Sequence, residues 1–450
     1  MRERVVGIAL VAACSFTPAY ERPALPVADA YGQGGGQGLA AADRGWREVF
    51  GDPRLQAVIE LALRNNRDLR IAALHVELAR AQYRIQRSAL LPTVNGLAGV
   101  DVRGRNTDIT TEYSVGVGAT FELDLFGRVR SLKAAALQAY LATEEARRAT
   151  HLALVGEVVA QYLRERAYDE QRLLAERTLA TVRESQDMTA RLLEAGQRSD
   201  LDVRTAEAQV HAARAEVARL SRLRAQAENA LVLLVGAQLP AQLPAPQPLE
   251  TAAVVADLPA GIPSEVLLRR PDILGAEHAL QAANANIGAA RAAFFPTISL
   301  TGFAGFASTA LSSLFTGGLV WSFSPQLTVP LFTGGRNAAN LDVAKVRKQI
   351  EVARYEQAIQ IAFREVADAL VARAMFDDQL AAQTARAVAE QKRFELSETR
   401  YKNGVESYLT VLAAQQDLYA TQQQLIELRL ARLTNLAQLY TALGGGWRDR

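Results

Sequence analysis

The chain has 450 residues, and its 50 basic and 48 acidic side chains leave a formal net charge of only +2. This balance excludes the concentrated positive charge that is typical of nucleic-acid-binding proteins. With a single cysteine, Cys14, an internal disulfide is excluded as well.

Residues 1–13 are expected to be a lipoprotein signal peptide. Arg2 and Arg4 precede an apolar run that is too short to cross a bilayer, which is typical of a secretion signal. The small residues directly before Cys14 resemble a bacterial lipobox, so cleavage there and acylation of the thiol, for example with palmitate, are expected. The alternative is a buried free cysteine. Residues 14–53 are then expected to form an extended, lipid-anchored tether.

The first repeat, residues 54–235, begins with a predicted helix from Arg54 to Leu90. Two strands follow, Thr93–Arg103 and Tyr113–Leu125, joined by a polar loop from Gly104 to Glu112. The second strand alternates strictly between apolar and small or polar residues, which predicts one apolar and one wet face.

A very long helix is predicted next, because the segment from Arg128 to Ala195 contains one interior glycine and no proline. Its length would be roughly 100 Å. The chain then turns at Gly196 and returns as a helix from Ser199 to Val235, roughly 55 Å long. Apolar positions in the long helix follow the spacing of coiled-coil packing. These positions include Leu152, Val155, Val159 and Tyr162.

A proline-rich connector, residues 236–263, separates the first repeat from a second, residues 264–443. The landmarks of the first repeat recur about 206 residues later, which indicates a duplicated half-protein rather than a short-period array. The expected elements are a first helix, strands Pro296–Ala307 and Trp321–Leu331, a long helix Arg336–Asn403 without glycine or proline, and a return helix Ser407–Leu443. A tail, residues 444–450, begins with a glycine-rich helix stop.

Strands of about ten residues with one apolar face fit a membrane β-barrel. Four strands cannot close a barrel, so several copies are expected to share one: two copies would contribute eight strands and three copies twelve. Two ordinary soluble hairpins packed on a core are the alternative. No apolar run of about 18 residues occurs, so a transmembrane helix is not expected.

Several long motifs, in the same order, resemble those of the TolC-like outer membrane efflux proteins, in particular the lipoprotein branch typified by OprM. They are FELDLFGR (121–128), LLRRPDILGAEHAL (267–280), IGAARAAFFPTISL (287–300) and LGGGW (443–447).

The resemblance implies a mainly α-helical homotrimer in the outer membrane of a Gram-negative bacterium. A twelve-stranded β-barrel would continue as a twelve-helix periplasmic α-barrel. The implied partners are outer membrane lipid, a periplasmic adaptor (membrane fusion) protein and an inner-membrane drug transporter of the RND type. The implied function is a passive exit duct for antibiotics and other small toxic compounds. The alternatives are a duct for metal ions or type I protein secretion and, in a different class, a lipid-anchored coiled-coil adaptor.

The two helix turns are the candidate functional sites. Gly196 with Ser199, and Gly404 with Ser407, are expected to form the tips that dock the adaptor. Each turn also places a leucine five residues after its glycine, Leu201 and Leu409. These leucines are expected to form a dewetted constriction that gates the duct.

The resemblance further implies a latch that holds the closed tip. Its matching positions are Tyr401 and Asp187, which would form a hydrogen bond, with Lys402 beside them as an ionic partner. A hydrogen bond from a phenol to a carboxylate is charge-assisted and therefore stronger than a neutral one. The alternative is that Tyr401 only packs between helices.

An enzyme is not expected. The four histidines are scattered along the chain, and no HExxH, GxSxG or P-loop motif occurs. We therefore expect no catalytic residue, no metal site and no cofactor.

Overall fold

The computed structural model describes residues 16–31, 45–105, 108–251 and 264–445. The predicted signal peptide and lipidation site, residues 1–13 and Cys14, lie outside these ranges, as do parts of the predicted tether, connector and tail. The chain divides into two compact units. Unit 1 comprises residues 1–25, 73–146 and 272–358, and unit 2 comprises residues 26–72, 147–271 and 359–450. Each unit therefore contains segments of both repeats.

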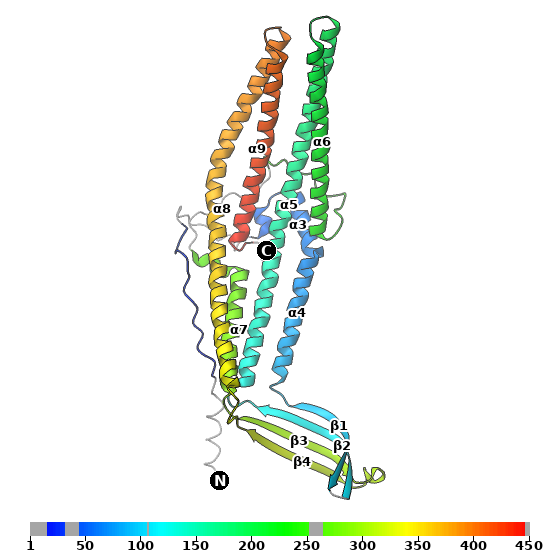
Figure 1. Cartoon of the computed structure of the whole chain (residues 1–450), viewed down its shortest axis with the longest axis vertical. Coiled ribbons are helices and arrows are strands. Elements are labelled where there is room, and N and C mark those ends of the chain that lie inside the picture. The colour runs from blue at the N-terminus through cyan, green and yellow to red at the C-terminus, as the bar shows by residue number, and fades with distance from the viewer. Residues whose placement is uncertain (1–15, 32–44, 106–107, 252–263, 446–450) are drawn as a thin grey trace. The chain divides into compact units, whose positions relative to one another are not determined.

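Unit 1 contains one antiparallel sheet with the strand order β1-β2-β3-β4 (Figure 1). The strands are β1 (Thr93–Arg105), β2 (Asp108–Leu123), β3 (Thr297–Ser308) and β4 (Leu319–Thr328), with a short 3₁₀ turn, η4 (Leu311–Ser313), before β4. Both predicted hairpins are confirmed. The loop predicted from Gly104 to Glu112 is wrong, because pairing continues through most of it and Arg103 lies opposite Thr110.

The register between the strands decides which side chains share a face of the sheet. Val117 lies opposite Ala304, and Ala304 lies opposite Trp321. Side chains alternate between the two faces along each strand, so the adjacent residues Gly118 of β2, Phe303 of β3 and Ser322 of β4 share the other face. The side chain of Trp321 is 75% exposed and that of Phe323, two residues on, is 60% exposed. One face of the sheet thus presents large apolar side chains that nothing in the described chain covers.

The described part of the predicted extended tether in unit 1, residues 16–25, has no helix and packs against helix α7 (Pro271–Ala292). Arg22 donates two hydrogen bonds of 2.9 Å to the two carboxylate oxygens of Glu277. The hydroxyl of Tyr20 donates a third, of 3.1 Å, to the same carboxylate. The side chain of Glu277 is only 7% exposed, and a buried carboxylate requires such partners.

Two other contacts align this segment with α7. Asn284 donates to the carbonyl oxygen of Pro18, and Arg291 donates to that of Phe16. The Phe16 ring stacks on Phe295, which in turn stacks on Phe126. Phe126 closely follows β2 and Phe295 closely precedes β3, so the N-terminal segment contacts the base of the second hairpin, and Phe295 connects it to the base of the first.

We predict that Glu277→Gln loosens this segment. The substitution removes the charge from hydrogen bonds that typically contribute about 1.5–3 kcal/mol each, although Arg22 is half exposed and water screens part of that gain. Limited proteolysis of the purified protein should cut between Phe16 and Tyr31 several-fold faster. Glu21→Gln is the matched control, since Glu21 is exposed and lies next to the pair. Equal cleavage of the two variants would contradict the prediction.

Unit 2 contains the two long helix hairpins seen in Figure 1. Helix α5 (Arg128–Glu194), which begins in unit 1, turns into α6 (Asp200–Val235), and α8 (Arg336–Lys402), which also begins in unit 1, turns into α9 (Tyr408–Ala442). All four agree with the predicted helices to within one residue at each end. The absence of internal Pro, together with the near absence of internal Gly, thus correctly identified them; the one exception is Gly156 in α5. No helix in the described ranges is long and apolar enough to cross a membrane.

The single helix predicted from Arg54 to Leu90 is wrong, because it is broken at Asn66 into α3 (Pro53–Asn65) and α4 (Arg67–Ser88). The side chain of Asn66 explains the break. Its Oδ1 accepts from the backbone N–H of Leu69, as an N-cap does, and its Nδ2 donates to the carbonyl oxygen of Leu234 on α6. The break therefore depends on a contact with a distant helix.

The core of unit 2 forms around the first residues of α3. Asp52 caps this helix and also accepts a 2.7 Å hydrogen bond from the hydroxyl of Tyr162 on α5. Just before it, helix α2 (Trp46–Val49) buries Trp46, and Phe50 packs edge-on against Tyr440. Residues 45–53 therefore belong to the core rather than to a tether. The predicted coiled-coil positions Leu152, Val155, Val159 and Tyr162 are all buried.

A short 3₁₀ helix, η3 (Ser264–Arg269), leads into α7, and α9 ends in a glycine turn. Gly444 has a φ of 79° and donates its N–H to the carbonyl oxygen of Thr441. This is the helix stop that the glycine-rich tail predicts.

Candidate functional site

The first helix turn is built from Gly196 and a capping box. Gly196 has a φ of 73°, which a residue without Cβ adopts readily. The hydroxyl of Ser199 accepts a 3.3 Å hydrogen bond from the N–H of Asp202, whose carboxylate accepts a 3.1 Å hydrogen bond from the N–H of Ser199. The Ser199 N–H, and after it the Ser199 hydroxyl, which donates a 2.8 Å hydrogen bond, hold the pKa of the Asp202 carboxylate below its usual value. The turn is therefore ordered by local hydrogen bonds.

The second turn repeats this construction at Gly404, whose φ is 74°. Gly404 donates its N–H to the carbonyl oxygen of Tyr401, and Ser407 caps α9 by accepting from the N–H of Thr410. Here a threonine stands where the first turn has a carboxylate. Both turns leave Gly and Ser exposed, as the prediction of docking tips requires.

The two predicted gate leucines are both exposed in the single chain. Leu201 is 74% exposed and Leu409 is 65% exposed, each in the first turn of the helix that follows its glycine. Apolar side chains at such exposure are available for contacts outside the chain.

A buried aromatic cluster joins the elements next to the two turns. Its buried members are Ala206, Tyr401, Tyr408 and Val411. The centroids of the Tyr401 and Tyr408 rings are 5.7 Å apart, and the Arg198 guanidinium lies 4.6 Å from the centroid of the Tyr401 ring. Burial raises the pKa of Tyr408, to which Ser185 donates a hydrogen bond of 3.4 Å. Arg198 belongs to the first turn and Tyr401 to the second, so the cluster ties them together.

The predicted hydrogen bond between Tyr401 and Asp187 is not formed. The hydroxyl of Tyr401 is buried and has no hydrogen-bond partner in the part of the chain that the structure describes, whereas Asp187 is exposed. Lys402 pairs with Glu398 at 3.0 Å instead. The physical reason is that Arg198 and Tyr408 cover the Tyr401 ring, so the phenol packs between helices.

Sequence reasoning missed Arg198, Tyr408 and Ser185. Tyr408 follows the capping serine directly and lies seven residues after Tyr401, a spacing that would have suggested an aromatic pair across the turn. Nothing in the sequence pointed to Arg198 or Ser185, because their partners lie on the other hairpin.

Acidification is predicted to loosen the first turn of α6. Because the pKa of Asp202 is lowered on folding, its stabilising contribution is present above about pH 4 and is lost as the pH falls through the lower folded pKa. The protection factors of the amides of Asp202 and its neighbours, which are exchange rates corrected for the intrinsic effect of pH, should therefore fall only below that range. The same measurement on Asp202→Asn should show faster exchange at neutral pH and no acid-dependent step. An identical pH profile in both proteins would refute this role.

The described residues contain no group of three or more His, Cys, Asp or Glu side chains that could hold a metal ion. The site is therefore described by its turns, its exposed leucines and the aromatic cluster.

Comparison with known proteins places the whole fold in context. A family model described as outer membrane efflux protein matches residues 58–237 and 262–445. The toluene efflux pump outer membrane protein TtgC of Pseudomonas putida is 47% identical over 458 residues, covering 98% of this chain and 94% of the relative. The cation efflux system protein CusC of Escherichia coli is 44% identical over 453 residues, covering 99% and 98%.

Solved structures agree with these sequence matches. The open state of the MtrE outer membrane channel of Neisseria gonorrhoeae superposes with a TM-score of 0.91 at 44% identity, covering 97% of this chain and 99% of that one. A CusC structure gives a TM-score of 0.89 at 44% identity, covering 96% and 100%. The likeness therefore includes the hairpins, both repeats and both turns.

Proposed function

The chain belongs to the outer membrane efflux protein family, and from this premise we propose that it is the passive exit duct of a tripartite pump for antibiotics and other small toxic compounds. The observation that carries the proposal is the sheet of unit 1, which exposes one apolar face and ends in two edge strands, β1 and β4, each paired on one side only. A sheet of this kind needs lipid on one side and further strands at its edges.

The edge strands support a barrel shared between copies. Every residue of β1 and of β4 is exposed in the single chain. Open edges are not tolerated in hydrocarbon, because their backbone N–H and C=O groups would lack partners. Pairing of β4 of one copy with β1 of the next satisfies both edges, and three copies then close a barrel of twelve strands.

Exposed apolar side chains on α4 support the same homotrimer. Leu74, Leu78 and Ile85 lie along one side of the helix and are 53%, 54% and 71% exposed. Such a row requires a partner surface, and a second copy of the chain can supply it.

The periplasmic adaptor is proposed to dock at the tips formed by Gly196, Ser199, Gly404 and Ser407. The support is their exposure and the exposed backbone of two αL glycines. The adaptor would in turn connect the duct to an inner-membrane transporter of the RND type. Leu201 and Leu409 are proposed to close the duct at rest as a dewetted ring. Acylation of Cys14 would add a lipid anchor in the outer membrane.

The test of the membrane assignment is alternate labelling along β2 and β4. Cysteines at Val117 and Phe323 should react with a lipophilic probe, and cysteines at Ser114 and Ser322 should react with a membrane-impermeant aqueous thiol reagent. Gly116 is unsuitable as a probe site, since a Cβ there would lie 2.5 Å from the carbonyl oxygen of Ala304. If the labelling does not alternate between successive residues, the assignment of these strands to a membrane β-barrel is wrong.

Export of metal ions is a second candidate, which the likeness to the cation efflux protein CusC favours. A strain that lacks this protein separates the two functions. Loss of resistance to toluene and antibiotics, with unchanged tolerance of metal cations, is the expected result. The reverse pattern would establish the metal duct.

A further inference from the structure

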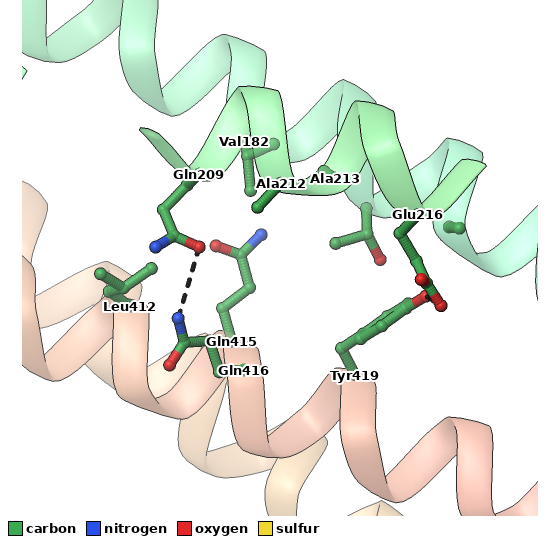
Figure 2. A pocket seen from close by; sticks show the side chains of 11 residues that line it. Val182, Gln209, Ala212, Ala213, Glu216, Leu412, Gln415, Gln416 and Tyr419 are labelled. Atoms are coloured by element: carbon green, nitrogen blue, oxygen red, sulfur yellow. Dashed lines mark hydrogen bonds between the residues drawn. The ribbon is translucent and has the colours of Figure 1, made fainter. Parts of the chain in front are cut away.

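A cavity of about 160 Å³ lies in unit 2 between α5, α6 and α9 (Figure 2). Its apolar lining includes Ala175 and Val182 of α5, Ala213 of α6 and Leu412 of α9. Ala175, Val182 and Leu412 are themselves buried, at 2%, 4% and 8% exposure. The cavity therefore has a buried apolar wall formed by helices from both repeats, whereas Ala212 and Gln416 on its rim are exposed.

Two hydrogen bonds cross from α6 to α9 at this cavity. Gln416 donates to the side-chain carbonyl oxygen of Gln209 at 3.3 Å, as Figure 2 shows, and the Tyr419 hydroxyl donates to Glu216 at 3.3 Å. The Glu216 carboxylate also accepts two bonds of 2.7 Å from Arg219. The one negative charge among the described lining residues is thus already paired.

Burial, followed by the nearby Glu216 charge, raises the pKa of Tyr419 to about 12. Its hydroxyl also accepts a 2.6 Å hydrogen bond from Gln423, so the hydroxyl already acts both as a donor and as an acceptor within the chain. Tyr419 therefore contributes a neutral aromatic wall at physiological pH and no free hydrogen-bonding group.

Gln415 differs from these polar neighbours. Its carboxamide extends toward α6 in Figure 2, and it has no hydrogen-bond partner among the residues that the structure describes. A carboxamide offers both a donor and an acceptor, and because Gln415 is only half-buried, a ligand can take the place of water at this group. The cavity thus combines an apolar wall with one polar group that no described residue occupies.

We infer that this cavity binds a small neutral aromatic alcohol of the phenol class. A cavity of about 150 Å³ in another protein accommodates benzene, so one six-membered ring matches the size. The ring would contact Val182, Leu412 and Tyr419, and the hydroxyl would hydrogen-bond to Gln415. Because Glu216 is paired with Arg219, a cation gains no free counter-charge there, and an anion would meet an existing carboxylate. The inference does not depend on the efflux function.

Such a ligand touches α5, α6 and α9 at once. It therefore stabilises the contact between the two helix hairpins by a free energy that grows with the logarithm of one plus the ratio of its concentration to its Kd. Binding should raise the temperature at which this contact is lost, which gives a direct readout.

The test uses the purified full-length protein in detergent, with phenol and toluene as probes and saturation-transfer NMR to measure each Kd. Gln415→Leu should weaken phenol about fivefold through the loss of one hydrogen bond, and it should leave toluene unchanged. Ala213→Leu fills the cavity and should weaken both probes at least tenfold. Ala208→Leu, an exposed α6 position outside the cavity, should bind both as the parent does.

The pattern across variants distinguishes the cavity from partition into detergent. Equal affinities in all four proteins would overturn the inference, as would equal loss of phenol and toluene in Gln415→Leu. If Ala213→Leu fails to fold, the comparison of phenol with toluene in Gln415→Leu still decides the outcome.

Discussion

Gly404→Pro is expected to abolish efflux while the copies still assemble in the outer membrane. Gly404 has a φ of 74°, whereas the proline ring fixes φ near −65°. The substitution also removes the N–H that donates to the carbonyl oxygen of Tyr401. Together these changes cost roughly 3 kcal/mol or more at one turn. Because the effect is local, the sheet of unit 1 should fold normally.

Gly404→Ala is the matched control for that experiment. A Cβ at this position meets nothing within 4 Å, so alanine adds only the αL strain of about 1–2 kcal/mol. Antibiotic susceptibility and the amount of assembled protein in the outer membrane fraction should be measured for both variants. We expect full sensitivity for proline and a partial effect for alanine. Unchanged resistance in Gly404→Pro would count against docking at the tips.

Trp321→Arg is expected to reduce the amount of protein in the outer membrane at least tenfold. Trp321 is 75% exposed and shares the apolar face of the sheet with Val117 and Ala304. An arginine on the lipid face of a membrane strand costs about 2–4 kcal/mol near the bilayer midplane. Each copy in a shared barrel would carry one such arginine, so the free-energy cost of assembly would be the sum over all copies. The assembled protein should therefore be lost almost completely.

Ser322→Arg supplies the control, since Ser322 is the next residue of β4 and its side chain lies on the opposite face. It should insert at nearly the level of the parent. Immunoblots of outer membrane fractions compare the two variants at equal expression. Loss of both proteins, or of neither, would show that the apolar face does not meet lipid.

The amino-acid sequence by itself determined the long helices, their turns and the two hairpins. The segment from Arg336 to Asn403 lacks glycine and proline, and α8 occupies all but its last residue. Gly196 and Gly404 predicted turns that the structure forms with positive φ. Period-two alternation in β2 predicted its strand. These features depend on local backbone preferences, which a short window of sequence contains.

The tertiary structure alone decided how distant segments meet. Pairing of β2 with β3 makes one sheet from two hairpins, and the break at Asn66 depends on a carbonyl of α6. Arg22 is bound to Glu277, which lies 255 residues further along the chain. The amino-acid composition of residues 14–53 predicts a tether, since composition contains no information about such a distant partner.

The same reason explains the failed hydrogen bond at the turns. The sequence placed Tyr401 and Asp187 correctly on their helices, but the rotation of those helices about their axes decides which side chains touch. Packing brought Arg198 over the Tyr401 ring and buried its hydroxyl without a partner in the described chain. Side-chain pairing between separate helices depends on the packing of the whole core, and local sequence preferences do not specify it.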